Sequence, residues 1–340
     1  MAVRRLCAVA AAALLAISFA DAAQAQDAQG AGSTFVAPMI AKWADSYAKN
    51  TGVKIGYDSV GSGAGIERIE SGSVDFGATD KPLPPSELAK YGLCQFPIVV
   101  GAVVPVVNLP GIAPGQIKFT GRILADIYQG KIKRWDDPAI RDLNEGLPLP
   151  SVPINVVHRT DGSGTTYNWV DFLAKSSTDW RNKIGVGLTV NWPVGVGGKG
   201  NDGVASAVLH TPGAIGYVEY STALKNRMAY AQVQNTFKLF ILPNPDTFQA
   251  AAATVDWRSA PDFSVMMTNA GGAASYPIAA TTFAIMYKAP KDRGRAAVAL
   301  KFLKWALEHG DGDATDLKYV PLPSNLVFQI EIYWKSHISL

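Results

Sequence analysis

Apolar side chains first recur at helical spacing near the start of the chain, at Ile40, Trp43 and Tyr47. Gly52 follows them, as glycine follows many helices, so the pattern predicts a helix that ends there. The stretch before it, residues 30–35 (GAGSTF), is rich in glycine, serine and threonine. The sequence therefore predicts a loop that leads into a helix N-terminus.

The same arrangement is predicted twice more. Residues 53–57 alternate as in a strand, residues 61–65 (GSGAG) read as a turn, and residues 66–71 resume a short helix. Later, residues 154–158 read as a strand and residues 161–165 (DGSGT) as a turn, followed by apolar residues at helical spacing. The chain thus holds three small-residue turns, each at the start of a helix.

The first residues follow a different pattern. Arg4 and Arg5 precede an apolar run over residues 6–20 and a small-residue site at residues 23–25 (AQA), which is the pattern of a cleaved signal peptide. A membrane anchor is the competing interpretation, but it needs roughly 20 apolar residues and lacks such a site. We therefore exclude residues 1–25 from the fold and expect a periplasmic protein, cleaved near Ala25.

Helical and strand patterns alternate over the remaining chain, which predicts an α/β protein of two domains. Hydrophobic residues make up 48% of the 340-residue sequence, enough for a substantial core. The apolar run over residues 96–107 contains Pro97 and Pro105, so it reads as strands and not as a membrane span, and one of these strands is a candidate to cross between domains.

Charge and cysteine content narrow the classes of function that the chain could have. Without Arg4, Arg5 and Asp21, the net charge falls from +3 to +2, which gives no basic excess for nucleic-acid binding. Cys94 is the only cysteine after the signal, so no internal disulfide is possible, and we expect a buried structural residue. Any recognition of an anion must therefore come from a local site.

The predicted helix starts offer such a site, because unpaired backbone N–H groups and a partial positive charge gather there. Arg159 and Asp161 flank the third turn. Arg159 can present a planar fork of donors to an oxyanion, Asp161 can orient it, and Ser163 and Thr165 add hydroxyl donors. A surface Arg–Asp pair beside a helix cap is the alternative, and spacing alone favours it as much as the anion site.

Asp80 ends the predicted strand over residues 74–80 and reads, by itself, as a turn residue. In an anion site a carboxylate is useful only when the ligand carries a proton that it can accept. Phosphate near neutral pH has such a proton and sulfate does not. A site with Asp80 would therefore discriminate strongly against sulfate.

Two enzyme classes stand as alternatives. Residues 195–200 (GVGGKG) match G-x-G-x-x-G, and Glu219 follows at about the ~20-residue distance of a dinucleotide site, which suggests an NAD-dependent oxidoreductase. However, residues 192–193 (WP) are a poor lead-in strand. A phosphate-ester hydrolase would be expected to show a G-x-S-x-G turn, which is absent. Residues 311–313 resemble a calcium loop too briefly to support a metal site.

Taken together, the chain resembles the periplasmic phosphate-binding proteins of phosphate-specific ABC transporters (PstS-type). The resemblance covers nearly the whole chain after the signal. It rests on six ordered blocks, at residues 30–35, 74–80, 130–135, 159–165, 197–203 and 212–220.

That resemblance implies a type II periplasmic-binding-protein fold, a two-lobe flytrap with two hinge-crossing strands and the ligand between the lobes. Residues 26–98 and 278–340 would form lobe I, and residues 99–277 lobe II. The implied function is phosphate binding and delivery to the permease subunits of an ABC importer, by a monomer without catalytic activity, metal or cofactor. The implied phosphate contacts are Thr34, Phe35 (main chain), Ser62, Asp80, Arg159, Ser163, Gly164 and Thr165, with Asp161 supporting Arg159.

Overall fold

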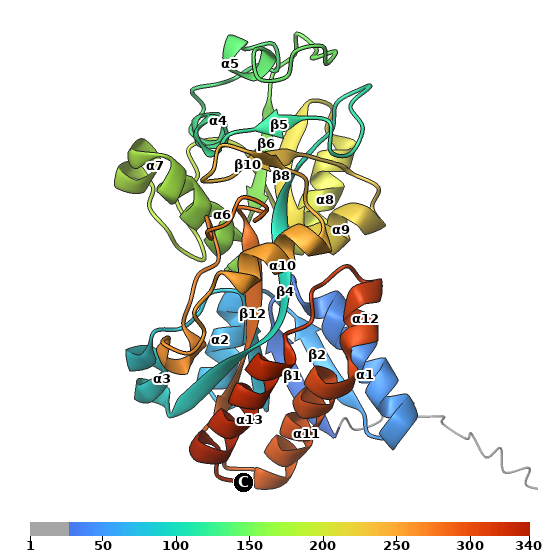
Figure 1. The fold of residues 1–340 in the computed structure, drawn as a ribbon, viewed down its shortest axis with the longest axis vertical. Helices are drawn as coiled ribbons and strands as arrows, with labels where there is room; N and C mark the ends of the chain where they lie inside the picture. Colours follow the sequence, from blue (N-terminus) through green and yellow to red (C-terminus); the bar gives the residue numbers. More distant parts are fainter. Residues whose placement is uncertain (1–26) are drawn as a thin grey trace, which may run out of the picture.

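The computed structural model describes residues 27–340, so the predicted signal peptide lies outside the described residues. Figure 1 shows two bodies, one above the other, joined at a waist. Two long strands pass through this waist, β4 (Leu93–Val107) and β12 (Ala279–Tyr287), and they pair in antiparallel fashion. This is the predicted α/β architecture of two lobes with two crossing strands.

Ten further strands complete the sheets. They are β1 (Ala28–Gly32), β2 (Ile55–Ser59), β3 (Phe76–Thr79), β5 (Lys118–Phe119), β6 (Asn155–Arg159), β7 (Val196–Gly198), β8 (Ala214–Glu219), β9 (Ala229–Tyr230), β10 (Gln232–Gln234) and β11 (Phe240–Ile241). The main sheet has the order β2-β1-β3-β12-β4-β8-β6-β7, with β9 also paired to β4. A small sheet has the order β11-β10-β5.

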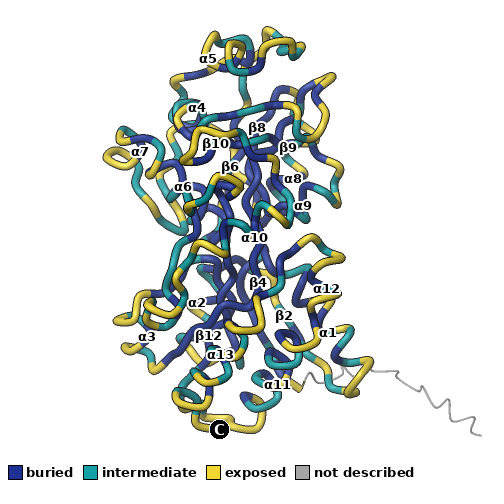
Figure 2. Tube along the Cα trace, in the orientation of Figure 1, coloured by how far each residue is buried: buried dark blue, intermediate teal, exposed yellow. Residues whose placement is uncertain are grey.

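The main sheet runs through both lobes because β4 belongs to both. Its first half pairs with β12, and Val103 to Val107 pair with β8. Every residue of β4 is buried, as is all of β12 except Tyr287. Figure 2 shows this buried path continuing through the waist. Movement of one lobe against the other would therefore bend these two well-packed strands.

Helices cover the sheet in each lobe. The lower body in Figure 1 holds α1 (Ala37–Thr51), α2 (Ser62–Glu70), α3 (Pro85–Tyr91), α11 (Arg293–His309), α12 (Asp311–Asp316) and α13 (Ser324–His337). The upper body holds α4 (Gly121–Tyr128), α5 (Pro138–Arg141), α6 (Gly164–Ser176), α7 (Thr178–Lys183), α8 (Gly200–His210) and α9 (Tyr220–Lys225). The helix α10 (Pro245–Ala253) lies near the waist, and η1 (Pro261–Phe263) is a short 3-10 turn.

The predicted helix at the start of the chain is α1, and Gly52 ends it with the left-handed φ of 77°. The second small-residue turn is different from the prediction, because α2 already begins at Ser62. Gly65 is part of this helix, and a Cβ there would lie 2.4 Å from the Cα of Gly32. Glycine at this position therefore allows α2 to pack closely on β1 and does not form a turn.

The range predicted for the second lobe includes one segment that packs on the first. The ring of Phe263 in η1 lies 5.3 Å from that of Tyr333 in α13, with an edge-to-face geometry. The hydroxyl of Tyr333 also donates a hydrogen bond to Asp262. Sequence patterns gave little information about this region, which has no strong helical or strand periodicity.

Cys94 is fully buried in β4, as expected for a structural residue, and burial raises the pKa of its thiol to about 12. The apolar run over residues 96–107 lies entirely within β4 and is a strand, as predicted. In residues 27–340, no helix has the length and apolar character needed to cross a membrane.

Candidate functional site

The three predicted junctions meet between the lobes, and a fourth helix start joins them. The N–H of Gly63, in the first turn of α2, donates a 2.8 Å hydrogen bond to the carbonyl of Gly162, which precedes α6. The side-chain amide of Asn201, in the first turn of α8, lies 2.9 Å from Thr34 Oγ1, just before α1. Four helix N-termini therefore face one region, where their dipoles favour an anion.

Arg159 supplies a full positive charge at this point. Its side chain is only 1% exposed, and its Nε donates to Oδ1 of Asp161 at 2.8 Å while Nη2 donates to Oδ2. The pKa of Asp161 is raised by burial, but the hydrogen bond and charge of Arg159 outweigh this and lower it overall. The pair is therefore a buried, two-point ion pair and not the surface pair that spacing alone allowed.

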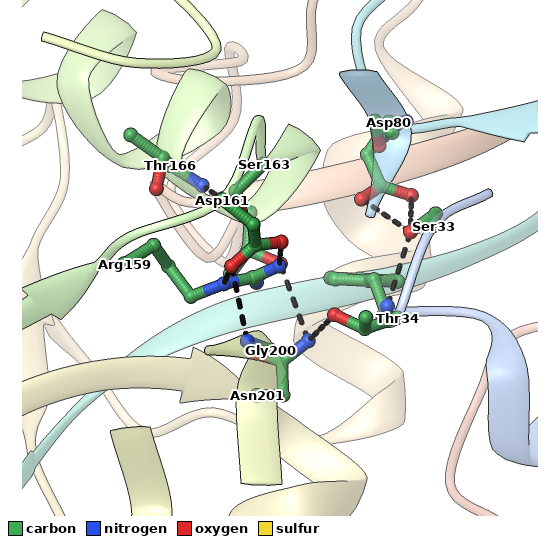
Figure 3. Close-up of polar contacts among 12 residues, drawn as sticks. Ser33, Thr34, Asp80, Arg159, Asp161, Ser163, Thr166, Gly200 and Asn201 are labelled. Carbon is green, nitrogen blue, oxygen red and sulfur yellow. Dashed lines mark hydrogen bonds and ion pairs between the residues drawn. The ribbon is translucent and has the colours of Figure 1, made fainter. Parts of the chain in front are cut away.

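Asp80 lies at the end of β3 and is 1% exposed. Ser33 Oγ is 2.8 Å from its Oδ1 and 2.7 Å from its Oδ2, and Thr282 Oγ1 is 2.6 Å from Oδ1. Figure 3 shows Asp80 and Ser33 together beside the Arg159–Asp161 pair. Burial raises the pKa of Asp80 to about 6, although the hydroxyls of Thr282, Ser33 and Ser62 and the charge of Arg159 oppose this shift. Unlike Asp161, Asp80 forms no ion pair with any residue in the described part of the chain.

The hydroxyls of four predicted contact residues are oriented as donors. Ser62 Oγ accepts from the N–H of Asp80, and Ser163 Oγ accepts from the N–H of Thr166. Asn201 Nδ2 donates to the hydroxyls of both Thr34 and Thr165. Each of these oxygens thus already accepts a hydrogen bond, which leaves the hydrogens of Thr34, Ser163 and Thr165 to donate to a ligand, whereas Ser62 also hydrogen-bonds the carboxylate of Asp80. The four residues concerned are Thr34, Ser62, Ser163 and Thr165.

The two remaining predicted contacts lie in the same region. The main-chain N–H of Phe35 donates to Ser33 Oγ at 3.0 Å, and its carbonyl accepts from the hydroxyl of Tyr319 at 2.6 Å. Gly164 is the first residue of α6, and a Cβ there would lie 2.5 Å from Asp80 Oδ2 and 2.4 Å from Ser62 Oγ. Only glycine allows the two lobes to approach this closely at that point.

Ser33, Asn201 and Thr282 take part in this network but were not predicted. Ser33 was inside a predicted loop, and Asn201 was inside one of the six blocks, so their positions carried a signal but their roles did not. Thr282 sits in an apolar strand with no local motif. Its contact with Asp80 joins residues 202 positions apart.

A cavity of about 550 Å³ opens beside these residues. Thr34 contributes from the first lobe, and Asp161, Gly200 and Asn201 contribute from the second. Lys199 and Lys225 also line it, and neither forms an ion pair with another described residue. An interlobe cavity with two positively charged side chains therefore lies beside Thr34 and Asp161.

The glycine-rich stretch that suggested a dinucleotide site serves packing. A Cβ at Gly198 would lie 2.6 Å from the backbone of Gly203, so β7 and the first turn of α8 are in close contact. Glu219 is 1% exposed and caps α9 by accepting from the N–H groups of Ser221 and Thr222 at 2.7 and 3.0 Å. Its carboxylate is therefore engaged inside the protein and does not face a ribose site.

The side chains of this site determine which kind of ligand it can bind. It provides hydroxyl and guanidinium donors on several sides and one carboxylate acceptor without a cationic partner. Donors alone would suit any small oxyanion, but the acceptor requires a ligand that brings a proton. The site therefore fits a small, tetrahedral, protonated oxyanion.

Comparisons with known proteins agree with this chemistry. A model of the PBP superfamily domain matches residues 18–309. The phosphate-binding protein PstS of Xylella fastidiosa is 51% identical over 307 residues, which cover 90% of this chain and 84% of the relative. The phosphate-binding protein PstS of Pasteurella multocida is 46% identical over 326 residues, with coverages of 96% and 95%.

The fold is also found among solved structures. PfluDING, a high-affinity periplasmic phosphate-binding protein solved bound with phosphate, superposes with a TM-score of 0.73 over 90% of this chain and 93% of that one. The two sequences are 22% identical, so this likeness supports the fold alone.

Proposed function

The chain belongs to the PBP superfamily domain family and, within it, to the PstS phosphate-binding proteins, and on this basis we propose that it captures inorganic phosphate between its lobes for an ABC-type importer. The observation that carries the proposal is the combination of convergent donors with Asp80, a buried carboxylate that has no ion pair. Phosphate near neutral pH satisfies both, because it is an anion that still carries a proton.

The contacts that we propose combine both lobes. Arg159, oriented by Asp161, gives charge-assisted hydrogen bonds, and Asp80 accepts the ligand's proton. The remaining donors are the hydroxyls and backbone N–H groups at the helix starts. The full proposed set is Thr34, Phe35 (main chain), Ser62, Asp80, Arg159, Ser163, Gly164 and Thr165, with Asp161 in support.

Capture would involve a hinge movement of two lobes. We take residues 26–98 and 278–340 as lobe I and residues 99–277 as lobe II, with β4 and β12 as the hinge. The hydrogen bond between Gly63 and Gly162 joins loops of opposite lobes, which favours describing this structure as closed. Closure would be the signal that the permease subunits recognise.

The proposed function also implies where the protein works and which proteins it contacts. We expect the mature chain to work as a periplasmic monomer after cleavage near Ala25, delivering phosphate to the permease subunits without entering the membrane. It would bind and release phosphate unchanged, without enzymatic activity. Several charge-assisted hydrogen bonds, at roughly 1.5 to 3 kcal/mol each, offset dehydration and immobilisation, so the expected dissociation constant is about micromolar or lower.

Calorimetric titration of phosphate into the ligand-free protein tests this function. The expected result is one site per chain with a dissociation constant of about micromolar or lower. A parallel assay with a phosphate ester should show no release of phosphate. Absence of phosphate binding would refute the proposal, and turnover of the ester would refute its non-enzymatic part.

A further inference from the structure

Thr282 occupies an unusual position between the ligand site and the hinge. It lies in β12, one of the two crossing strands, and is fully buried. The pairing of β12 with β4 changes register between Thr282 and Phe283, where Ile98 is an extra residue in β4. Such bulges bend a strand and redirect its side chains, and they are frequent beside functional sites.

The neighbouring ladder explains which group Thr282 meets. Phe283 pairs with Thr79 at the end of β3, so Thr282 lies beside the next residue, Asp80. Its hydroxyl donates to Asp80 Oδ1 at 2.6 Å. No residue of the second lobe takes part in this contact, which therefore connects the crossing strand directly to the carboxylate.

The two oxygens of Asp80 have different surroundings. Oδ1 lies within hydrogen-bond distance of both Thr282 and Ser33, whereas the described contacts of Oδ2 include Ser33 but not Thr282. The Ser62 hydroxyl also hydrogen-bonds this carboxylate. Oδ2 is also the oxygen that lies next to Gly164, at the N-terminus of α6. One oxygen is thus held on the side of the hinge strand, and the other faces the region where the anion would bind.

We propose that Thr282 is a positioning residue for anion selectivity: its hydroxyl holds Oδ1 of Asp80 and leaves Oδ2 to accept the proton of the bound ligand. This inference rests on the proposed function and adds a residue to it. By stabilising the ionised carboxylate, Thr282 keeps Asp80 an acceptor, which a proton-bearing anion satisfies and a fully ionised one does not.

The other groups around Asp80 leave a shift in its ionisation measurable, because the two tyrosines that interact with its charge do not titrate near neutral pH. Arg159 is the only cation among the described residues that contributes to the pKa of Asp80, and it also favours the ionised form. Tyr57 and Tyr319 feel the charge of Asp80, but burial raises their pKa values well above the usual 10, so neither titrates near neutral pH. Loss of the Thr282 hydroxyl should therefore raise the pH at which Asp80 ionises.

Sulfate is a suitable probe because it carries no proton to give over the range from about pH 5 to about pH 8. It should bind poorly while Asp80 is ionised and better once Asp80 is protonated and can donate to it. The midpoint of sulfate affinity against pH then reports the ionisation of Asp80.

The experiment compares Thr282→Val, Thr282→Ser and Thr281→Val by calorimetry with sulfate and with phosphate over this pH range. Thr281 is the matched control, since it is the adjacent buried threonine and its hydroxyl contacts Met267 Sδ instead. We expect Thr282→Val to move the sulfate midpoint upward by about one pH unit. Thr282→Ser should restore the wild-type midpoint, and Thr281→Val should not change it.

The possible outcomes separate the two proposals. If wild type binds phosphate but Thr282→Val leaves the sulfate midpoint unchanged, the inference about Thr282 is wrong and the proposed function stands. An equal loss of phosphate and sulfate affinity at every pH would indicate a merely structural role and would also overturn it. If wild type does not bind phosphate, the proposed function itself fails.

Discussion

Each side of the cleft holds one aspartate, fully buried in the case of Asp80 and partly buried in the case of Asp161, and the surroundings of the two have opposite effects. Asp161, in the second lobe, forms a two-point ion pair with Arg159, which outweighs burial and lowers its pKa. Asp80, in the first lobe, meets only hydroxyls, and burial raises its pKa to about 6. The comparison shows that the partners of a carboxylate decide whether it orients a donor or remains an acceptor.

The largest expected effect on phosphate binding comes from removing Arg159, the cationic partner of Asp161. Arg159→Ala should weaken phosphate binding by about 100- to 1,000-fold, because it removes a charged donor and leaves the carboxylate of Asp161 without its cationic partner, with only the N–H of Gly200 still donating to it among the described contacts. Calorimetry measures the loss. Arg134→Ala is a matched control, since Arg134 pairs with Asp136 at the same sequence spacing but at the surface. A loss of similar size in both variants would contradict the assigned role.

The contrast between the aspartates should also appear in the stability of the ligand-free protein. Asp80 has a folded pKa of about 6, above its unfolded value, so its contribution to stability is fully present below about pH 4 and is lost as the pH rises through about 6. This loss amounts to about 3 kcal/mol at most. Asp80→Asn should remove it, so the variant gains free energy of unfolding relative to wild type between about pH 4 and about pH 7.5.

Asp161→Asn should behave in the opposite way. The folded pKa of Asp161 is lowered, so its stabilisation is present above the unfolded pKa and is lost as the pH falls through the folded pKa. The variant should therefore be more destabilised near neutral pH than in acid. Urea unfolding of both variants at several pH values tests the pair. If the change in free energy of unfolding varied with pH in the same direction in both variants, the proposed contrast between the two aspartates would be wrong.

Much of this site could be predicted from local sequence, and the rest could not, for a physical reason. Glycine, serine and threonine before a helical pattern identify helix starts within a few residues, which located the turns that hold Thr34, Ser62 and Ser163. The contact roles of Thr34 and Ser62, however, were implied only by the family resemblance. Asn201 bridges Thr34 and Thr165, which lie 167 and 36 residues away from it. Such contacts depend on how distant segments are brought together by the sheet.

The overall fold was also predicted only in part. Alternating strand and helix patterns predicted the α/β class and the strand nature of residues 96–107. The packing of η1 on α13 was not predictable, because it depends on contacts of Tyr333 with Phe263 and Asp262, which lie far from it in the sequence. The helical start of α2 was missed because Gly65 reads as a turn residue in sequence, although in the fold it serves close packing on β1.

The next expected effect concerns how closely the two sides approach each other. Gly164→Ala places a methyl group within 2.5 Å of Asp80 Oδ2 and within 2.4 Å of Ser62 Oγ, so closure should be hindered. Phosphate affinity should fall by about 10- to 100-fold, and small-angle scattering should show a more open shape with phosphate present. Gly312→Ala is the control, because a Cβ there meets nothing within 4 Å. Full closure of the Gly164 variant would contradict this account.

The smallest expected effect lies at the entrance. Lys199 and Lys225 line the cavity and have no ion-pair partner within residues 27–340, so they should speed the arrival of phosphate. Changing both to Gln should slow association by roughly two- to fivefold at low salt, with little change in dissociation. Stopped-flow measurements at two salt concentrations test this, with Lys291→Gln/Lys301→Gln as a control of equal charge change. An identical effect of both pairs would rule out local steering.

The central claim is that Asp80 selects the ligand by accepting its proton, and titrating phosphate and sulfate into wild type and Asp80→Asn near neutral pH tests it most directly. Wild type should bind phosphate at least about 1,000-fold more tightly than sulfate, and Asp80→Asn should reduce that ratio by roughly 10- to 100-fold. Comparable binding of the two anions by wild type, or an unchanged ratio in the variant, would contradict the claim.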